Sequence, residues 1–162
     1  IFSKEDVKLE ETTHHDMHPR VIGEHILNHV EKGGKLLGHN IINFDLPVIR
    51  DSLDCWSAND VLQKHSENLI DTKVLVDKAS LSVGKIATSL DQLSKHTLNS
   101  GKSMKSVEAP EAWRAGKFRE VTEYCLKDAK LTYDLYMYGK ENGIIKSRSL
   151  DSGEIIEVEV EW

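Results

Sequence analysis

Apolar residues in the N-terminal part of the chain follow a helical period. From Pro19 onward they recur at steps of three and four residues, as on one face of a helix, at Ile22, Ile26, His29 and Val30. The glycines of "KGG" (32–34) are typical of the residues that end a helix. The next segment, "KLLGHN" (35–40), is too short for a helix and predicts a buried strand.

Pro47 fixes the start of the following element. Proline is tolerated in the first turn of a helix, because its missing N–H would have no partner there anyway. A helix that runs through Leu53 therefore begins at about Asn43–Leu46. Asp45 is then expected at the junction between the strand and this helix.

Two further segments follow in the middle of the chain. "NLIDTKVLV" (68–76) is short and apolar, and Asp71 interrupts it. "SLDQLSKHTL" (89–98) predicts a helix capped by Ser89, followed by the loop "NSGKSMKS" (99–106).

The last third of the chain predicts one long helix and a hairpin. The helix is expected from about Lys117 to Gly139, with a buried stripe made of Phe118, Val121, Cys125, Ala129, Thr132 and Tyr136. Residues 144–162 then alternate between apolar and polar on both sides of a turn at Asp151–Glu154. This alternation predicts a C-terminal β-hairpin.

Composition and charge narrow the class of protein. The 162 residues, 39% hydrophobic and 30% charged, fit one globular domain with a single core. No apolar run approaches the roughly 18 residues of a membrane span, and no signal peptide is visible, so no membrane partner is expected. Cys55 and Cys125 lack the spacing of a metal site and predict reduced core thiols in the cytoplasm. The net charge of −6 argues against a tight duplex binder, but not against an enzyme with an acidic metal site.

Tyr124 and Asp128 form the first candidate site. They are four residues apart on the expected long helix and therefore project from the same side. Leu131 and Leu135 continue this line, so the pair borders a buried region. A partly buried carboxylate beside a phenol needs a cation, a hydrogen-bond donor or a metal. The alternative is an ordinary Tyr–Asp pair on the surface.

Two stretches together resemble a known family. "GHNIINFDLPVI" (38–49) and "YCLKDA" (124–129) resemble the second and third motifs of the DEDD superfamily of 3′–5′ exonucleases. The likeness is closest to the proofreading domain of B-family DNA polymerases, with the patterns N-x-x-x-F-D-x-P and Y-C-x-x-D-A. Glu123 stands where another subclass has histidine, so the resemblance implies the tyrosine subclass. It covers roughly residues 33 to 140, and the matching residues are Asn40, Phe44, Asp45, Pro47, Tyr124, Cys125, Asp128 and Ala129.

The resemblance implies an RNase H-like α/β fold. We expect a single domain over 1–162, truncated at its N-terminal end relative to the family, with the hairpin at 144–162 outside the general pattern. The family's fold holds two divalent ions, Mg²⁺ or Mn²⁺, about 4 Å apart. The resemblance assigns Asp128 as a direct metal ligand, Asp45 as a ligand to the second ion or a residue that orders it, and Tyr124 as the group that positions the attacking water.

The implied activity is 3′–5′ exonuclease hydrolysis of a single-stranded nucleic acid by a two-metal-ion mechanism, and as its substrate we favour DNA over RNA. Asn40 and Phe44 would contact the last nucleotide, and Lys102 its backbone. The chain would be either a free-standing nuclease or one associated with a helicase or another replication or repair protein. The family's first motif, D-x-E, is not found in this sequence, and "KLEETT" (8–13) has Leu9 where the aspartate should stand. Either the first strands lie upstream of Ile1 or the protein is a degenerate relative, so the isolated chain is expected to be inactive or weakly active.

Two other functions remain open. The first is a catalytically inactive module of nuclease-like fold that binds or scaffolds. The second is an interaction domain in which both motifs are accidental.

Several residues have two interpretations each. His25 and His29, with "HHDMH" (14–18), have spacings that could bind zinc, but His29 falls on the apolar stripe. Asp71 is either a strand-end acid near the site or a cap. Trp113 is either a core anchor, which we favour, or a base-stacking platform. A basic rim for the substrate or a merely solvated loop is predicted at Lys102, Lys105, Arg114 and Lys117.

Overall fold

The computed structural model describes residues 19–52, 56–101 and 107–162. It confirms a mixed α/β protein with small sheets. The chain divides into two compact units. Unit 1 consists of Ile1–Leu36 and Ile41–Ile70, and unit 2 of Leu37–Asn40 and Asp71–Trp162. The single RNase H-like domain stays a prediction.

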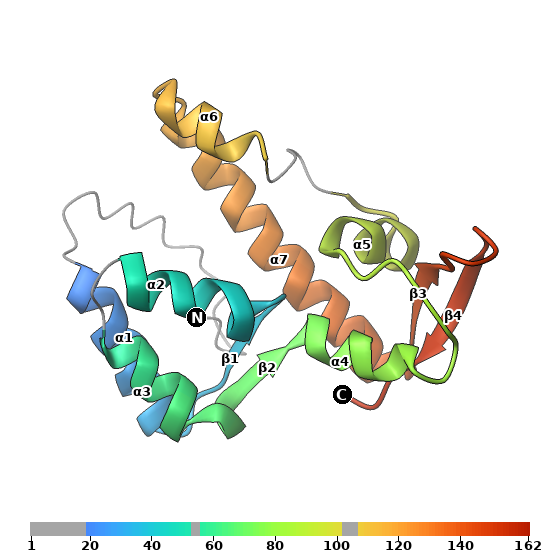
Figure 1. Ribbon diagram of the computed structural model, residues 1–162, viewed down its shortest axis with the longest axis horizontal. Helices are drawn as coiled ribbons and strands as arrows, with labels where there is room; N and C mark the ends of the chain where they lie inside the picture. The colour runs from blue at the N-terminus through green and yellow to red at the C-terminus, as the bar shows by residue number, and fades with distance from the viewer. Residues whose placement is uncertain (1–18, 53–55, 102–106) are drawn as a thin grey trace. The chain divides into compact units, whose positions relative to one another are not determined.

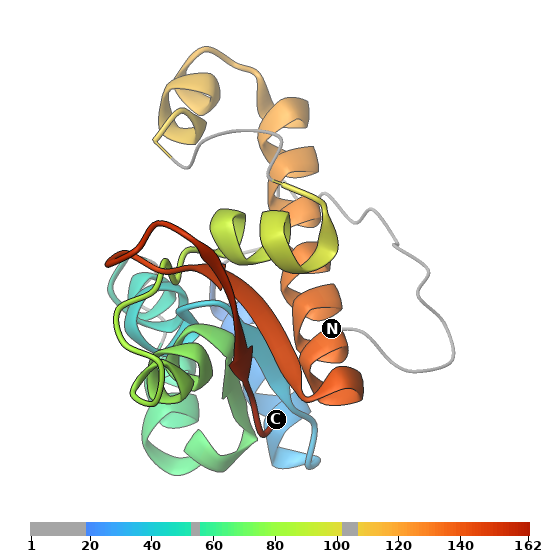
Figure 2. The same cartoon turned by 90° about the vertical axis from the view of Figure 1, so that its right-hand side faces the viewer.

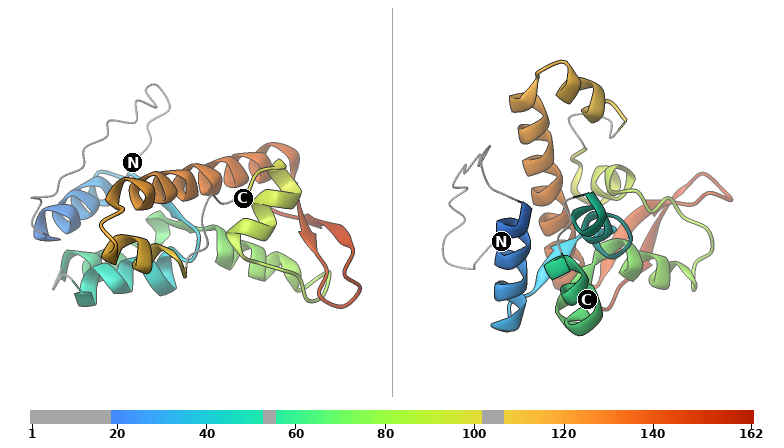
Figure 3. Two further views of the ribbon diagram at one scale, coloured as in Figure 1. Left: turned by 90° about the horizontal axis from the view of Figure 1, so that it is seen from above. Right: turned by 60° about the vertical axis from the view of Figure 1, so that its left-hand side comes forward.

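Unit 1 is built from three helices, which Figure 3 shows gathered beside one another. They are α1 (Pro19–Glu31), α2 (Leu46–Ser52) and α3 (Trp56–Lys64). A π-helical turn (Ile41–Asp45) precedes α2, and a 3₁₀ turn (Ser66–Asn68) follows α3. The core of the unit is formed by the buried side chains of Val30, Leu46 and Val61.

Pro47 and the glycines after α1 lie at the helix ends where the sequence predicts them. Pro47 is the second residue of α2, in the turn where its missing N–H costs no hydrogen bond. Gly33 follows α1 with a φ of 81°, in the left-handed region that favours glycine. At the next residue, Gly34, the backbone passes directly over the imidazole of His29. The Nε2 atom of that ring lies 3.2 Å from the carbonyl oxygen of Lys35.

The strands β1 (Leu36–Gly38) and β2 (Leu69–Asp71) form a two-stranded sheet. β1 is the strand that the sequence predicts at "KLLGHN". Both strands contain a boundary between the units, because Leu36 belongs to unit 1 and Leu37 to unit 2, and Ile70 to unit 1 and Asp71 to unit 2.

Unit 2 holds four helices and a hairpin. The helices are α4 (Thr72–Ser80), α5 (Leu90–Leu98), α6 (Ala109–Arg114) and α7 (Phe118–Asn142). Figure 1 shows α6 at the N-terminal end of the long α7, and Figure 2 shows α5 lying across α7. The strands β3 (Ile144–Arg148) and β4 (Ile155–Glu159) pair antiparallel, as the alternating sequence predicts. The core consists of Val76, Ile86, Leu90, Leu93, Leu131, Leu135, Ile145, Val158 and Val160.

The buried face of α7 differs from the predicted stripe. Its buried residues are Tyr124, Leu131, Thr132, Leu135 and Gly139. The expected stripe shares only Thr132 with this face, while Phe118, Cys125 and Ala129 are exposed. The prediction of a core thiol at Cys125 is therefore wrong. The two leucines decide the orientation, because they fill the space next to α5 and β3 far better than the small side chains of cysteine and alanine.

The C-terminal residue packs on α7 at a glycine. The indole of Trp162 stacks on the ring of Tyr136, with centroids 5.7 Å apart and planes 5° from parallel. A Cβ atom at Gly139 would lie 2.7 Å from the indole. Glycine at this position therefore lets the end of the chain approach the helix closely.

Within the described residues, none of the helices combines the length and the apolar character needed to cross a membrane.

Ser94 and Ser147 give a first prediction about stability. Both are fully buried, but within the described part of the chain the Oγ of Ser94 has no hydrogen-bond partner, whereas that of Ser147 donates to the carbonyl of Ala87 at 2.6 Å. Ser94→Ala should leave the free energy of unfolding unchanged or raise it by up to about 1 kcal/mol, because alanine removes an unsatisfied hydroxyl from a helix. Ser147→Ala should lower it by about 1–2 kcal/mol. Urea denaturation checks both, and a larger loss for Ser94→Ala would contradict the assignment.

Candidate functional site

Tyr124 and Asp128 lie one turn apart on the buried face of α7. The side chain of Tyr124 is only 7% exposed. Asp128 is half-buried, and its Oδ1 atom is buried. The hydroxyl of Thr132 donates to the backbone carbonyl of Asp128 at 2.9 Å, one turn further along. The pair is therefore not the ordinary surface pair of the alternative interpretation.

Asp45 lies where the chain enters α2. It is the last residue of the π-helical turn Ile41–Asp45, and the first residue of α2 follows at once. That residue, Leu46, is 1% exposed and anchors the turn in the core of unit 1. Asp45 and Phe44 are exposed, Phe44 by 59%. Single π-helical turns are rare and frequently occur at functional sites.

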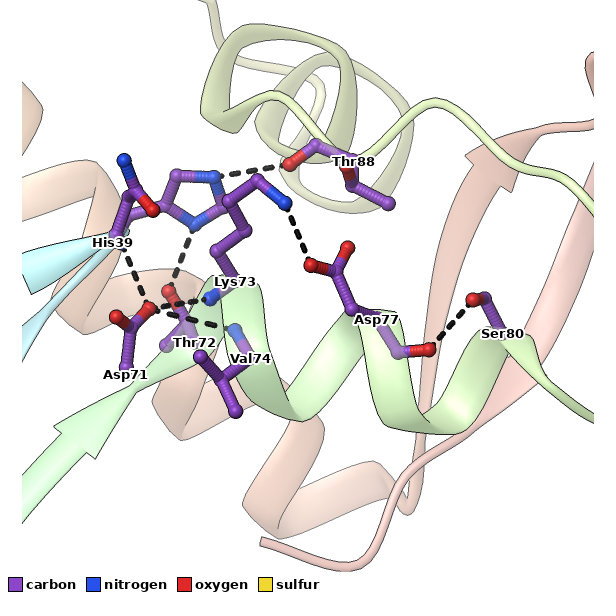
Figure 4. A network of polar contacts seen from close by, with 9 residues as sticks. His39, Asp71, Thr72, Lys73, Val74, Asp77, Ser80 and Thr88 are labelled. Atoms are coloured by element: carbon purple, nitrogen blue, oxygen red, sulfur yellow. Dashed lines mark hydrogen bonds and ion pairs between the residues drawn. The ribbon is translucent and has the colours of Figure 1, made fainter. Parts of the chain in front are cut away.

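Asp71 connects the end of β1 with the start of α4, as Figure 4 shows. Its Oδ1 atom accepts a hydrogen bond from the backbone N–H of Asn40 at 2.7 Å. The same oxygen accepts from the N–H groups of Lys73 at 3.0 Å and Val74 at 3.4 Å, which makes Asp71 the N-cap of α4. Asp71 is only 3% exposed. The interpretation of Asp71 as a cap is therefore confirmed, and the residue is also the last of β2, while a place near the site stays a prediction.

His39 binds two other segments of unit 2. Its Nδ1 atom lies 2.9 Å from the hydroxyl of Thr72, and its Nε2 atom lies 3.0 Å from the carbonyl oxygen of Thr88. The hydroxyl of Thr72 also lies 3.2 Å from the carbonyl oxygen of Gly38. Figure 4 shows His39, Thr72 and Thr88 around the end of β1. The sequence interpretation did not identify this network, because no local pattern links residues 33 and 49 positions apart.

The predicted site residues fall in both units. Unit 2 contains Asn40, Tyr124 and Asp128, and unit 1 contains Phe44 and Asp45. The remaining predicted contact, Lys102, lies outside the described residues. Residues 8–18, Cys55 and Lys105 also lie outside them.

No preformed metal cage exists within the described ranges. In 19–52, 56–101 and 107–162, no group of three or more His, Cys, Asp or Glu side chains is arranged to hold a metal ion. Asp45 and Asp128 nevertheless offer carboxylate oxygens, the donor type that Mg²⁺ and Mn²⁺ prefer.

Trp113 on α6 and Phe118 at the start of α7 are both exposed, contrary to the preferred interpretation of Trp113. Its side chain is 50% exposed, so the prediction of a core anchor is wrong. Trp113 packs edge-to-face against Phe118, with centroids 4.6 Å apart. Nearby, the ammonium group of Lys117 lies 3.4 Å from the carboxylate of Glu120, which partly neutralises the proposed basic rim.

Asp51 on α2 is an acid close to Asp45 in the sequence. Replacing Asp51 shows what the loss of one negative charge does without the loss of Asp45. Asp51 is exposed and forms an ion pair with Arg50. The hydrogen bond from the guanidinium of Arg50 lowers the pKa of Asp51 and raises the pKa of Arg50. Asp51 is therefore a control residue for experiments on Asp45.

Comparison of the chain with family models, with curated proteins and with solved structures finds no match.

Proposed function

We propose that the chain is a 3′–5′ exonuclease domain of RNase H-like fold that acts on single-stranded nucleic acid. The observation that carries this proposal is the placement of Tyr124 and Asp128 one turn apart on the buried face of α7. A tyrosine hydroxyl and an aspartate carboxylate beside a core require a hydrogen-bond partner, a cation or a metal. The resemblance to the exonuclease motifs, not a contact in the structure, assigns Asp45 as the second acid, and its side chain is exposed at the entry to α2.

The reaction is hydrolysis of the terminal phosphodiester bond. The oxygen of a water molecule attacks phosphorus, and the bond between phosphorus and the 3′ oxygen breaks. The leaving oxygen takes up a proton, and a nucleoside monophosphate is released. In this proposal the hydroxyl of Tyr124 hydrogen-bonds the attacking water and orients it toward phosphorus.

Asp45 and Asp128 are the residues that would hold divalent cations. When bound, Mg²⁺ or Mn²⁺ supplies positive charge that favours attack on the phosphate and departure of the 3′ oxygen. The chain's own contribution is to hold the two carboxylates in place, Asp128 by the rigid α7 and Asp45 by the anchored turn before α2.

Binding of Mn²⁺ tests the proposal directly. A titration that follows free Mn²⁺ by electron paramagnetic resonance should show that Asp45→Asn and Asp128→Asn each raise the Kd by about tenfold or more. Asp51→Asn and Asp134→Asn are the matched controls. Asp51 lies on α2, directly after the turn that ends at Asp45, and pairs with Arg50. Asp134 lies on α7 with Asp128 and pairs with Lys130. The controls should leave the Kd unchanged. Equal affinity of all four variants would overturn the metal site.

Hydrolysis is measured on a 5′-labelled single strand, with DNA and RNA versions and with a duplex as controls. We expect slow loss of nucleotides from the 3′ end in Mn²⁺, and no loss with Tyr124→Phe or Asp128→Asn. Binding of Mn²⁺ and of the strand without any hydrolysis would favour the alternative function, a nuclease-like module that only binds.

A further inference from the structure

Asn40 has an unusual backbone conformation. Its φ is 75°, in the left-handed region that residues other than glycine rarely adopt. Among the described residues, one other non-glycine residue, Asn99, has a positive φ, and it has the ordinary reason that it ends helix α5. Asn40 ends no helix and instead follows strand β1. Such a conformation persists only where the surrounding contacts hold it.

The carboxylate of Asp71 is one of these contacts. A helix cap requires only the N–H groups of the first turn, here those of Lys73 and Val74. The N–H of Asn40 is an additional donor to the same oxygen, and at 2.7 Å it is the shortest of the three bonds. The carboxylate is almost fully buried, so these donors compensate the loss of water. Asp71 therefore fixes the turn at Asn40 to the start of α4.

His39 is the residue just before the turn, and its side chain is held in place by two contacts. The carbonyl of Thr88 can only accept, so the Nε2 of His39 carries the hydrogen and donates it. The Nδ1 atom is engaged with the hydroxyl of Thr72. With both ring nitrogens in use, the imidazole has one orientation and is not available as a metal ligand or a general base. It ties the end of β1 to two other segments of unit 2.

We propose that Asp71 and His39 are positioning residues that hold the turn at Asn40 so that the amide of Asn40 binds the 3′-terminal nucleotide. This inference rests on the proposed function. It adds that Asp71 and His39 hold Asn40, the residue that contacts the substrate, in place. A primary amide offers both donors and an acceptor, which suits the hydroxyl groups of the terminal sugar or the edge of its base. A preset backbone turn lowers the entropy lost when the nucleotide binds.

The test distinguishes a loss of the turn at Asn40 from a loss of stability in helix α4. Asp71→Ser keeps a good cap for α4, but its single, shorter hydroxyl replaces the carboxylate that also reaches Asn40. Ser89→Ala is the matched control, because it removes the cap of α5 and leaves the Asn40 turn intact. Hydrogen exchange of the Asn40 amide should accelerate about tenfold or more in Asp71→Ser and stay unchanged in Ser89→Ala.

Binding of a fluorescent single strand with a free 3′ hydroxyl, measured by anisotropy in Ca²⁺, gives the functional readout. Asn40→Ala and Asp71→Ser should each raise the Kd by about five- to tenfold, and the double variant should bind no more weakly than Asn40→Ala alone. Ser89→Ala should bind like the original chain. A strand that ends in a 3′ phosphate should show smaller differences between the variants.

The outcomes distinguish the two proposals. If the original chain does not bind the strand, the proposed function fails and this inference fails with it. If the chain binds but Asp71→Ser leaves the Kd unchanged, or the two substitutions add fully, only the positioning role is overturned. Unchanged exchange of the Asn40 amide in Asp71→Ser would also overturn that role, whatever the affinity.

Discussion

Leu135→Ala should lower the free energy of unfolding of unit 2 by about 3 kcal/mol. The side chain of Leu135 is 0% exposed and lies in the same core cluster as Leu93 and Ile145. Alanine removes buried methyl groups and leaves a cavity that a helix on one side and a hairpin on the other cannot close. A loss of this size is a large part of the stability of a small domain.

The measurement and its control follow from the fold. Urea unfolding monitored by circular dichroism gives the total change, and hydrogen exchange in α5 and β3 shows whether unit 2 carries it. Leu81→Ala is the control, because Leu81 is 85% exposed in the turn after α4. It should change the free energy of unfolding by less than about 0.5 kcal/mol. Similar effects of the two leucines would contradict the assigned core.

The second large effect is expected in unit 1, where Gly34→Ala should cost about 2 kcal/mol. A Cβ atom at Gly34 would lie only 2.3 Å from Nε2 of His29, with two more ring atoms within 2.6 Å. Such distances are impossible between unbonded atoms, so the imidazole has to move away. In moving, it also loses its contact with the carbonyl of Lys35.

A double-mutant cycle identifies the cause of this loss. In a His29→Ala background the ring is absent, and Gly34→Ala should then cost less than about 0.5 kcal/mol in thermal or urea unfolding. An equal cost in both backgrounds would show that the clash with the ring is not responsible. The cycle also bears on the zinc hypothesis, because it measures a packing role for His29 that needs no metal.

Elements with strong local signals could be predicted from the sequence. Pro47 placed the start of α2, Ser89 the start of α5, and "KGG" (32–34) the end of α1. The alternation of residues 144–162 predicted the hairpin. In each case the signal and its effect lie within a few residues of each other.

Helix α4 shows why other elements could not be predicted. It begins inside "NLIDTKVLV" (68–76), and the part of this segment that belongs to the helix carries three β-branched residues, Thr72, Val74 and Val76. Such residues favour strands in general, but here burial of Thr72 and Val76 in unit 2 outweighs that preference. The cap at Asp71 was visible in the sequence only as one of two interpretations. Helices α3 and α6 were not predicted either.

The candidate site could be predicted only in part. The line from Tyr124 through Asp128 to the leucines follows from helical spacing, and the structure places that line on the buried face. The exposure of Trp113 does not follow from spacing, because it depends on which elements α6 packs against. The contacts of His39 depend on residues far away along the chain.

The stack of Trp162 on Tyr136 provides an optical probe of the end of the chain. With Trp56 and Trp113 replaced by phenylalanine, the indole of Trp162 becomes the sole tryptophan emitter. The parallel contact with the phenol ring of Tyr136 shields the indole from water. Release of the indole from this stack would shift its emission to longer wavelength. The colour of that emission would therefore report, in real time, whether the last residues of the chain leave α7 before the core beneath them opens.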